Sequence, residues 1–377
     1  MSEIDLGTFA EYLRPIGPHM PPQLISPSSF ANISRTAHVL PGALAMGLFG
    51  FECRLAEEAP VADFQLCADA AFNAKNSLAR TIASGNVLLN NHRVWQRIND
   101  FVEAWSASES LLNKHLRNIW LEFDISDAPR EVPVPSIFLG LYTSEERRST
   151  PAENNNGTAN ERADPSTIQV VCLNALTLLM GNPVLEPVAQ KFREAIQKIP
   201  APGEVGFVGT MLARNVNAFR MIVRGLDRMR IIEYLSHLHW PGQLSEVEAA
   251  LDSTSRFSDY LWLNIDVGEH IYPKISWECY FNKRAQPQDD GRWQEFLDYL
   301  VESEMCLPAK REGLLAYPAV IGQSTAGALW PDSLRLLSRA LGPLALRRCV
   351  TALHHIKIVY QPGRPLEAKA YLCAHYE

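Results

Sequence analysis

An alternating strand pattern that recurs along the chain is the feature that most limits how it can fold. Residues 119–125 read I-W-L-E-F-D-I and residues 261–267 read L-W-L-N-I-D-V, so two distant segments match almost letter for letter. Polar and apolar side chains alternate in both, which is typical of a β-strand with one polar and one apolar face. A turn and a second alternating strand follow each segment, which predicts a β-hairpin.

The same layout occurs five times, and segments with a helical period separate the copies. The predicted hairpins span residues 47–67, 119–142, 205–225, 261–281 and 355–376. The predicted helices span residues 93–116, 183–199, 291–305 and 331–353. Each hairpin carries its polar side chains on one face, so the five polar faces can turn toward a common interior.

Closure into one barrel is the arrangement that this repeat favours, because closure leaves no exposed sheet edge. We predict an α+β fold: a ten-stranded antiparallel β-barrel built from five helix–hairpin–helix (αββα) repeats. The helices cover the outside and the polar faces line a lumen, which ten strands make wide enough for a ligand. Separate open sheets, each with one hydrated face, are the alternative.

We expect a single domain over residues 1–377, because the repeat keeps its rhythm along the whole chain. An N-terminal segment, residues 1–45, precedes the first hairpin. Residues 143–166 contain almost no apolar side chains, which predicts a mobile loop within the domain.

The charge balance limits the partners. The formal net charge of −7 argues against nucleic acid or an anionic membrane as the main partner. No apolar run is long enough to span a bilayer, and the acidic, proline-broken N-terminus is not a signal peptide. The seven cysteines are scattered without metal-ligand spacing, which favours reduced thiols, a cytoplasmic location and no metal site.

Five such repeats resemble the ABBA, or PT-barrel, aromatic prenyltransferases, and short motifs strengthen the resemblance. The segment GFECRL places Glu52 where the fungal indole prenyltransferases carry a glutamate that orients the aromatic acceptor, and LEFDI, residues 121–125, resembles their second hairpin. The segment EAKAYL resembles their Lys-x-Tyr strands. The resemblance implies a natural-product tailoring enzyme that transfers a prenyl group to an aromatic or peptidic acceptor bound in the lumen.

The resemblance also assigns roles to individual residues. Glu52 orients the nucleophile, and Tyr280 and Tyr371 shield the allyl cation. The diphosphate of the donor is held by four cations: Arg220, Arg224, Lys274 and Lys369. No cofactor is implied, apart from Mg²⁺ if it accompanies a prenyl diphosphate co-substrate.

Other polar and aromatic residues of the hairpins are candidate substrate-binding groups. They are Glu122, Asp124, Asp266, Glu278, Trp120, Trp262 and His375. The carboxylates either meet the substrate or pair with neighbouring cations. The two tryptophans either stack on a ring or carbocation, or plug the end of the barrel.

Two further functions remain open because the predicted lumen carries more carboxylates than cations. Ser136 and Phe138 stand where a Lys-x-Tyr pair is expected, so the diphosphate cage is incomplete. The same barrel without a prenyl donor fits a peptide-modifying enzyme that works by acid/base chemistry, such as a cyclisation or elimination. A non-enzymatic binding partner, in a complex with the enzymes of a biosynthetic pathway, is the third reading.

Overall fold

A computed structural model of the chain describes residues 6–69, 75, 78, 89, 91–125, 132–142, 164–214, 218–282, 285–342 and 345–377. Its strands are β1 (Phe49–Arg54), β2 (Ala62–Asp69), β3 (Leu116–Phe123), β4 (Ser136–Leu141), β5 (Glu204–Thr210), β6 (Phe219–Arg224), β7 (Tyr260–Val267), β8 (Ile271–Tyr280), β9 (Ala319–Gly322), β10 (Arg348–Tyr360) and β11 (Glu367–Tyr376).

Ten of these strands close into a barrel, as predicted. The order around the sheet is β11-β1-β2-β3-β4-β5-β6-β7-β8-β10, and β10 pairs with β11 to complete the ring. Each neighbouring pair is antiparallel. Consecutive strands pair as hairpins where the alternating patterns predict them, and the seam between β1 and β11 joins the two ends of the chain.

The strand β9 is an addition that the sequence did not indicate. It pairs with the first residues of β10 and lies outside the ring. The predicted helix over residues 331–353 is wrong beyond Leu341, because α15 (Asp332–Leu341) ends there and β10 begins at Arg348. Burial along the start of β10 alternates with period two, so this part of the chain has strand and not helical character.

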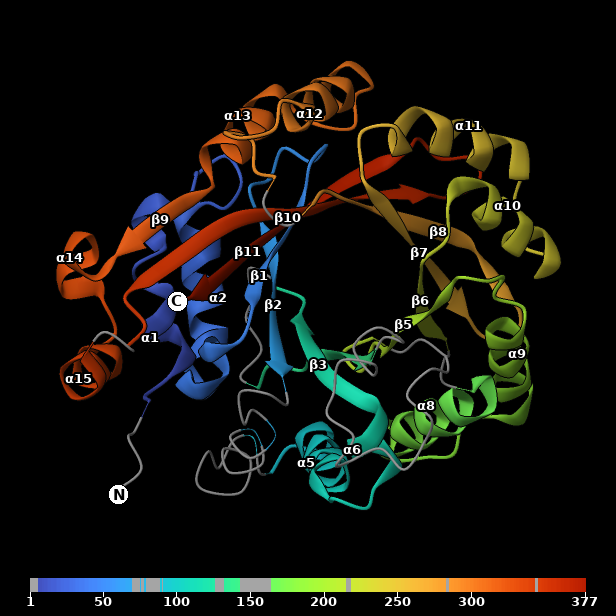
Figure 1. Ribbon diagram of the computed structural model, residues 1–377, viewed down its shortest axis with the longest axis horizontal. Helices are drawn as coiled ribbons and strands as arrows, with labels where there is room; N and C mark the ends of the chain where they lie inside the picture. The colour runs from blue at the N-terminus through green and yellow to red at the C-terminus, as the bar shows by residue number, and fades with distance from the viewer. Residues whose placement is uncertain are drawn as a thin grey trace.

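The helices lie around the outside of the ring of strands (Figure 1). They are α1 (Phe9–Leu13), α2 (Pro27–His38), α5 (Arg93–Ser106), α6 (Leu111–His115), α8 (Pro165–Met180), α9 (Glu186–Gln197), α10 (Arg228–His237), α11 (Leu244–Ser255), α12 (Arg292–Glu302), α13 (Pro308–Ala316), α14 (Gln323–Ala326) and α15, with the 3₁₀ turns η1 (Gly17–His19), η2 (Gly42–Met46) and η5 (Gly327–Leu329).

The apolar core fills the space between these helices and the outer faces of the strands. The ring of Phe9 in α1 packs edge-on against Phe49 of β1, with ring centroids 5.1 Å apart. On the opposite side of the barrel, Phe192 of α9 packs against Phe219 of β6 at 6.2 Å. Since the apolar faces of the strands pack against the outer helices, the polar faces point into the barrel.

Part of the predicted loop lies outside the described residues. Of residues 143–166, the structure describes only the last three, and Pro165 already occupies the first turn of α8. In the predicted N-terminal segment, residues 6–45 carry α1 and α2, which pack against one another. No helix within the described ranges combines the length and the apolar character that a membrane crossing requires.

Candidate functional site

Polar side chains of neighbouring strands meet on the inner face of the barrel. The register aligns Arg54 of β1 with Lys369 of β11, and Lys369 with Lys357 of β10. Three cations therefore stand in one row across three adjacent strands. The next row, one pleat along, contains Glu52, Tyr371 and His355.

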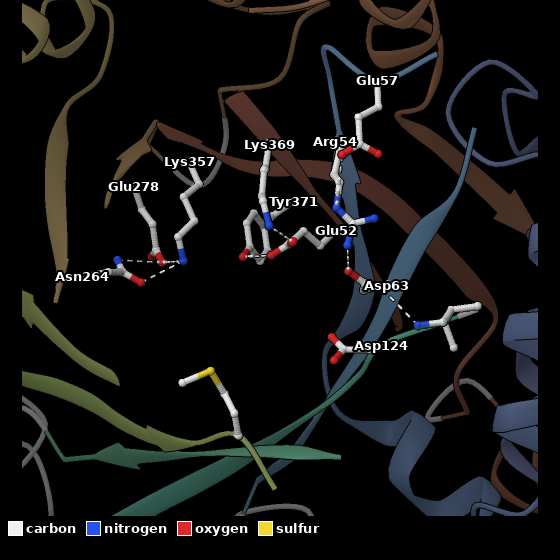
Figure 2. Close-up of polar contacts among 12 residues, drawn as sticks. Glu52, Arg54, Glu57, Asp63, Asp124, Asn264, Glu278, Lys357, Lys369 and Tyr371 are labelled. Atoms are coloured by element: carbon white, nitrogen blue, oxygen red, sulfur yellow. Dashed lines mark hydrogen bonds and ion pairs between the residues drawn. The ribbon is translucent and has the colours of Figure 1, made fainter. Parts of the chain in front are cut away.

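Glu52 is held in place by two other predicted site residues, Lys369 and Tyr371 of β11. Its carboxylate accepts hydrogen bonds from Nζ of Lys369 at 2.5 Å and from the hydroxyl of Tyr371 (Figure 2). Burial opposes its ionisation, but the charges of Lys369 and Lys357 and these hydrogen bonds lower the pKa of Glu52 to about 2. Glu52 therefore carries a fixed negative charge.

A second buried cluster lies beside it on β7, β8 and β10. The ammonium of Lys357 donates to Oδ1 of Asn264 at 2.8 Å and lies 3.5 Å from Glu278, whose other oxygen accepts the hydroxyl of Tyr280 at 2.7 Å. Burial lowers the pKa of Lys357. The imidazole of His355 stacks on Tyr371, with centroids 4.1 Å apart, so the ring connects the two clusters.

The remaining predicted arginines also have carboxylate partners. Arg220 forms a bidentate pair with Asp266 at 2.8 and 3.0 Å, on adjacent strands β6 and β7. Arg224 pairs with Glu204 at 3.2 Å. These four side chains keep 15–22% of their surface exposed, so solvent reaches the inner wall of the barrel here.

The β1–β2 hairpin adds a third charged group. Arg54 donates to Asp63 at 2.8 Å and lies 3.8 Å from Glu57 (Figure 2). The predicted residue Asp124 lies close by in Figure 2, but it is exposed and pairs with Arg214 at 2.5 Å.

Aromatic rings gather at one part of the inner wall. Trp262 of β7 lies 4.7 Å from Tyr280 and 5.8 Å from Phe207, measured between ring centroids. Tyr260 stacks on Tyr280 at 5.1 Å. The other predicted tryptophan, Trp120 on β3, is half-buried and outside this group. The ring of Tyr280, whose hydroxyl donates to Glu278, joins this aromatic group to the second charged cluster.

Three predicted residues make no hydrogen bond or ion pair with the described members of these clusters. Lys274 is exposed near the start of β8 and makes no hydrogen bond or ion pair with a described residue. His375 is 39% exposed, near the end of β11, and lies 3.6 Å from Glu377. Glu122 is half-buried on β3, where the register places it opposite Gln65 and Ser136.

Sequence reasoning missed several members of the site: Lys357, Asn264, His355, Arg54 and Asp63. Alternation from His355 places Lys357 on the same face, which is a signal that the segment HIKIVY contains. Asn264 occupies the position of Glu122 in the matched segments quoted above. The pairing of Arg54 with Asp63 depends on the register of β1 and β2, which the pattern alone does not define.

No group of three or more histidine, cysteine, aspartate or glutamate side chains suited to a metal ion occurs in the part of the chain that the structure describes.

The fold is that of the ABBA, or PT-barrel, aromatic prenyltransferases. The chain is similar to the prenyltransferase PriB, with a TM-score of 0.52 and 10% identity over 96% of this chain and 94% of PriB. It is also similar to 5-dimethylallyltryptophan synthase from Streptomyces coelicolor, with a TM-score of 0.51 and 12% identity over 98% of both chains.

A third similar structure is AnaPT from Neosartorya fischeri, with a TM-score of 0.51 and 12% identity over 99% of this chain and 92% of that one. No family model matches the sequence, and no curated protein does either. This chain therefore shares its fold with all three solved structures but little of its sequence.

Proposed function

We propose that this protein is a prenyltransferase-like tailoring enzyme, which transfers a prenyl group from an allylic diphosphate to an aromatic or peptidic acceptor inside the barrel. The row of cations formed by Arg54, Lys369 and Lys357 carries the proposal. A diphosphate has about three negative charges and needs several converging lysine or arginine donors. The fold shared with aromatic prenyltransferases also supports it.

The row beside these cations supplies the groups that the next step requires. When the bond between the allylic carbon and the diphosphate oxygen breaks, its electron pair leaves with the diphosphate and an allyl cation remains. We assign the stabilisation of this cation to the electron-rich rings of Tyr371 and Tyr280, which stack on His355 and Tyr260 respectively. The fixed charge of Glu52 keeps lone pairs free to orient a polar hydrogen of the acceptor.

The ion pairs of the inner wall favour a second candidate. Lys369, Lys357 and Arg54 each have a carboxylate partner, so a diphosphate must displace or share those partners. A peptide-modifying enzyme that works by acid/base chemistry leaves the same pairs intact. Its substrate would be a neutral or cationic chain and not a polyanion.

Pyrophosphate binding separates the two candidates. We expect pyrophosphate to raise the melting temperature of the wild-type protein at constant ionic strength, because a ligand that binds only the folded state stabilises it. Lys357→Met should abolish this rise. The matched control is Lys274→Met, which removes an exposed lysine outside the row and should keep it.

Turnover is the second measurement. The protein is incubated with dimethylallyl diphosphate and a set of indoles, phenols and tyrosine- or tryptophan-containing peptides, with and without Mg²⁺, and products are detected by mass spectrometry. A gain of one prenyl group supports the transferase. If pyrophosphate leaves the melting temperature unchanged and no acceptor is prenylated, the acid/base candidate replaces it.

A further inference from the structure

Among the buried or half-buried carboxylates on the described barrel strands, Glu122 is the one without a hydrogen-bond or ion-pair partner. It makes no hydrogen bond and no ion pair with any residue that the structure describes, whereas Glu52, Asp63 and Glu278 are each bound to a cation. The residue is half-buried and lies on the polar face of β3, opposite Gln65 and Ser136.

A comparison of two hairpins gives the physical reason. Glu122 stands opposite Ser136 in the β3–β4 hairpin, just as Asn264 stands opposite Ser276 in the matching β7–β8 hairpin. In the β7–β8 hairpin, Asn264 hydrogen-bonds to Glu278, two residues beyond the serine. The equivalent position beyond Ser136 is Phe138, which offers no polar atom. The repeat thus leaves Glu122 exposed to whatever occupies the lumen.

The surroundings of Glu122 contain charges of both signs. On its own strand Asp124 is bound to Arg214, and the adjacent strands place Gln65 and Ser136 opposite it. The charged groups that act on it from other strands are Glu52 on β1, Asp63 on β2, Arg220 on β6 and Lys357 on β10. Burial and the charge of Glu52 raise the pKa of Glu122 to about 7, against the opposing charges of Lys357 and Arg220.

The pKa of Glu52 is thus about 2 and that of Glu122 about 7, although both lie on the same barrel wall. Such a difference between two carboxylates is typical of a site in which one keeps a fixed charge and the other transfers a proton. Asp63 is the other candidate, since its pKa is raised to about 6. Its oxygens are already occupied, however, by Arg54 at 2.8 Å and by the backbone N–H of Ile125 at 3.0 Å. Because Asp63 is already bound to the cation Arg54, it is less suited than the unpaired Glu122 to take up a proton.

We propose that Glu122 is the catalytic base that removes the proton of the acceptor, whereas Glu52 only positions it; this inference rests on the proposed prenyl transfer. After the diphosphate has left with the electron pair of the broken C–O bond, a ring carbon of the acceptor uses a π electron pair to form a bond to the allyl cation. The resulting arenium ion then passes its ring proton to the carboxylate of Glu122, and the electron pair of the C–H bond restores the aromatic ring. Glu122 later releases the proton to water.

The test compares Glu122→Gln with wild type on an acceptor that is prenylated. We expect kcat to fall by 10²- to 10⁴-fold with little change in KM, because general base catalysis contributes about that much. The wild-type rate should rise with pH through about 7, and this rise should disappear in the variant. Glu122→Asp should restore part of the rate, and Glu295→Gln, on the exposed face of α12, should behave as wild type.

A substrate-free measurement keeps the inference separate from the proposed function. In protein labelled with ¹³C at the glutamate carboxyl, a resonance that titrates near pH 7 should be absent in Glu122→Gln. Absence of wild-type turnover with every acceptor overturns the prenyl transfer and not the proton-holding role. A normal titration of Glu122 near pH 4.5, or an unchanged rate and pH profile in Glu122→Gln, overturns the assignment of the base.

Discussion

At the scale of single residues, the ion pair between Glu52 and Lys369 can be tested directly by mutation. Glu52 is 4% exposed, so Lys369→Met leaves a nearly buried negative charge with only the hydroxyl of Tyr371 as a direct partner. Loss of one member of a buried pair costs about 3–5 kcal/mol, whereas replacement of both members is often close to neutral. We therefore expect a loss of roughly 3 kcal/mol in Lys369→Met and a partial recovery in the double variant with Glu52→Gln.

Urea unfolding at pH 7 measures both free energies. Lys274→Met is the control, because an exposed lysine away from ion pairs should change stability by no more than about 0.5 kcal/mol. Equal losses in the single and the double variant would mean that the side chains contribute through packing and that their charges do not interact.

The raised pKa of Glu122 gives a second prediction, on pH dependence. Its folded value of about 7 lies above the value of about 4.5 expected in the unfolded chain, so the folded state holds an extra proton between these limits. The stability contributed by this group is fully present below about pH 4.5 and is lost as the pH rises through 7. Gln mimics the protonated form, so Glu122→Gln should exceed wild type in stability by about 1–3 kcal/mol at pH 8.

Thermal or urea unfolding at pH 5 and pH 8 checks this sign. The advantage of Glu122→Gln should shrink toward zero at the lower pH, and Glu295→Gln should show no advantage at either. A variant that is less stable than wild type at pH 8 contradicts the prediction.

The sequence identifies the faces of strands better than it identifies pairs of residues. Alternation alone places Glu52, Lys369 and Tyr371 on polar faces, and the structure brings them together. Their mutual contacts depend on the closing register of strands more than 300 residues apart in the chain, which no local pattern specifies. The absence of a partner for Glu122 is equally non-local, since it follows from what the facing strands carry.

At the scale of elements, the alternation of polar and apolar residues predicted strands more reliably than the 3.6-residue apolar repeat predicted helices. The hairpins were predicted at their observed places, but the helical pattern over residues 331–353 ran into β10. The reason is that an amphipathic helix and a half-buried strand share many apolar positions in a short window. The short edge strand β9 carries only four residues and gives no signal of its own.

One contact between elements holds the site in position from outside. Lys310 of α13 is 1% exposed, and its ammonium donates to the backbone oxygens of Arg54 at 2.6 Å and Ala59 at 3.2 Å. These are the end of β1 and the turn that follows it. The helix thus fixes the backbone of a residue that belongs to the cation row.

Lys310→Met should weaken this connection, because it leaves two carbonyl groups without their donor. The expected loss is about 2–6 kcal/mol, since each of the two unsatisfied carbonyl groups costs about 1–3 kcal/mol. Pyrophosphate affinity should fall as well, although Lys310 does not face the lumen. Lys191→Met on α9 is the matched control, because among the described residues this lysine pairs only with Glu194 of the same helix. Unchanged stability in Lys310→Met would show that water replaces the ammonium.

At the scale of the whole molecule, the barrel depends on the seam between β1 and β11. Closure removes the two exposed edges that an open sheet of ten strands would present. It also brings Glu52 to Lys369, so the integrity of the barrel and the charge of the site are linked. A defect in the seam should therefore affect stability and ligand binding together.

Gly50 provides that test. A Cβ atom at this position would lie 1.8 Å from the carbonyl oxygen of Leu372 and 3.1 Å from the Cα of Cys373, both in the backbone of β11. Backbone atoms of a paired strand cannot move aside as a flexible side chain can, so Gly50→Ala must push β1 and β11 apart. We expect a loss of at least about 3 kcal/mol, the upper end of ordinary overpacking costs.

Gly206→Ala is the matched control, because it adds the same methyl group to another strand of the same barrel. The nearest atom to a Cβ at Gly206 is 3.5 Å away, which is ordinary contact, so its effect should stay within about 1 kcal/mol. Calorimetry should show a single unfolding transition at a lower temperature for Gly50→Ala. The reason is that all ten strands belong to one closed ring, so weakening the seam destabilises the whole barrel at once. Two transitions, or equal effects of the two substitutions, would show that the seam is not what unites the molecule.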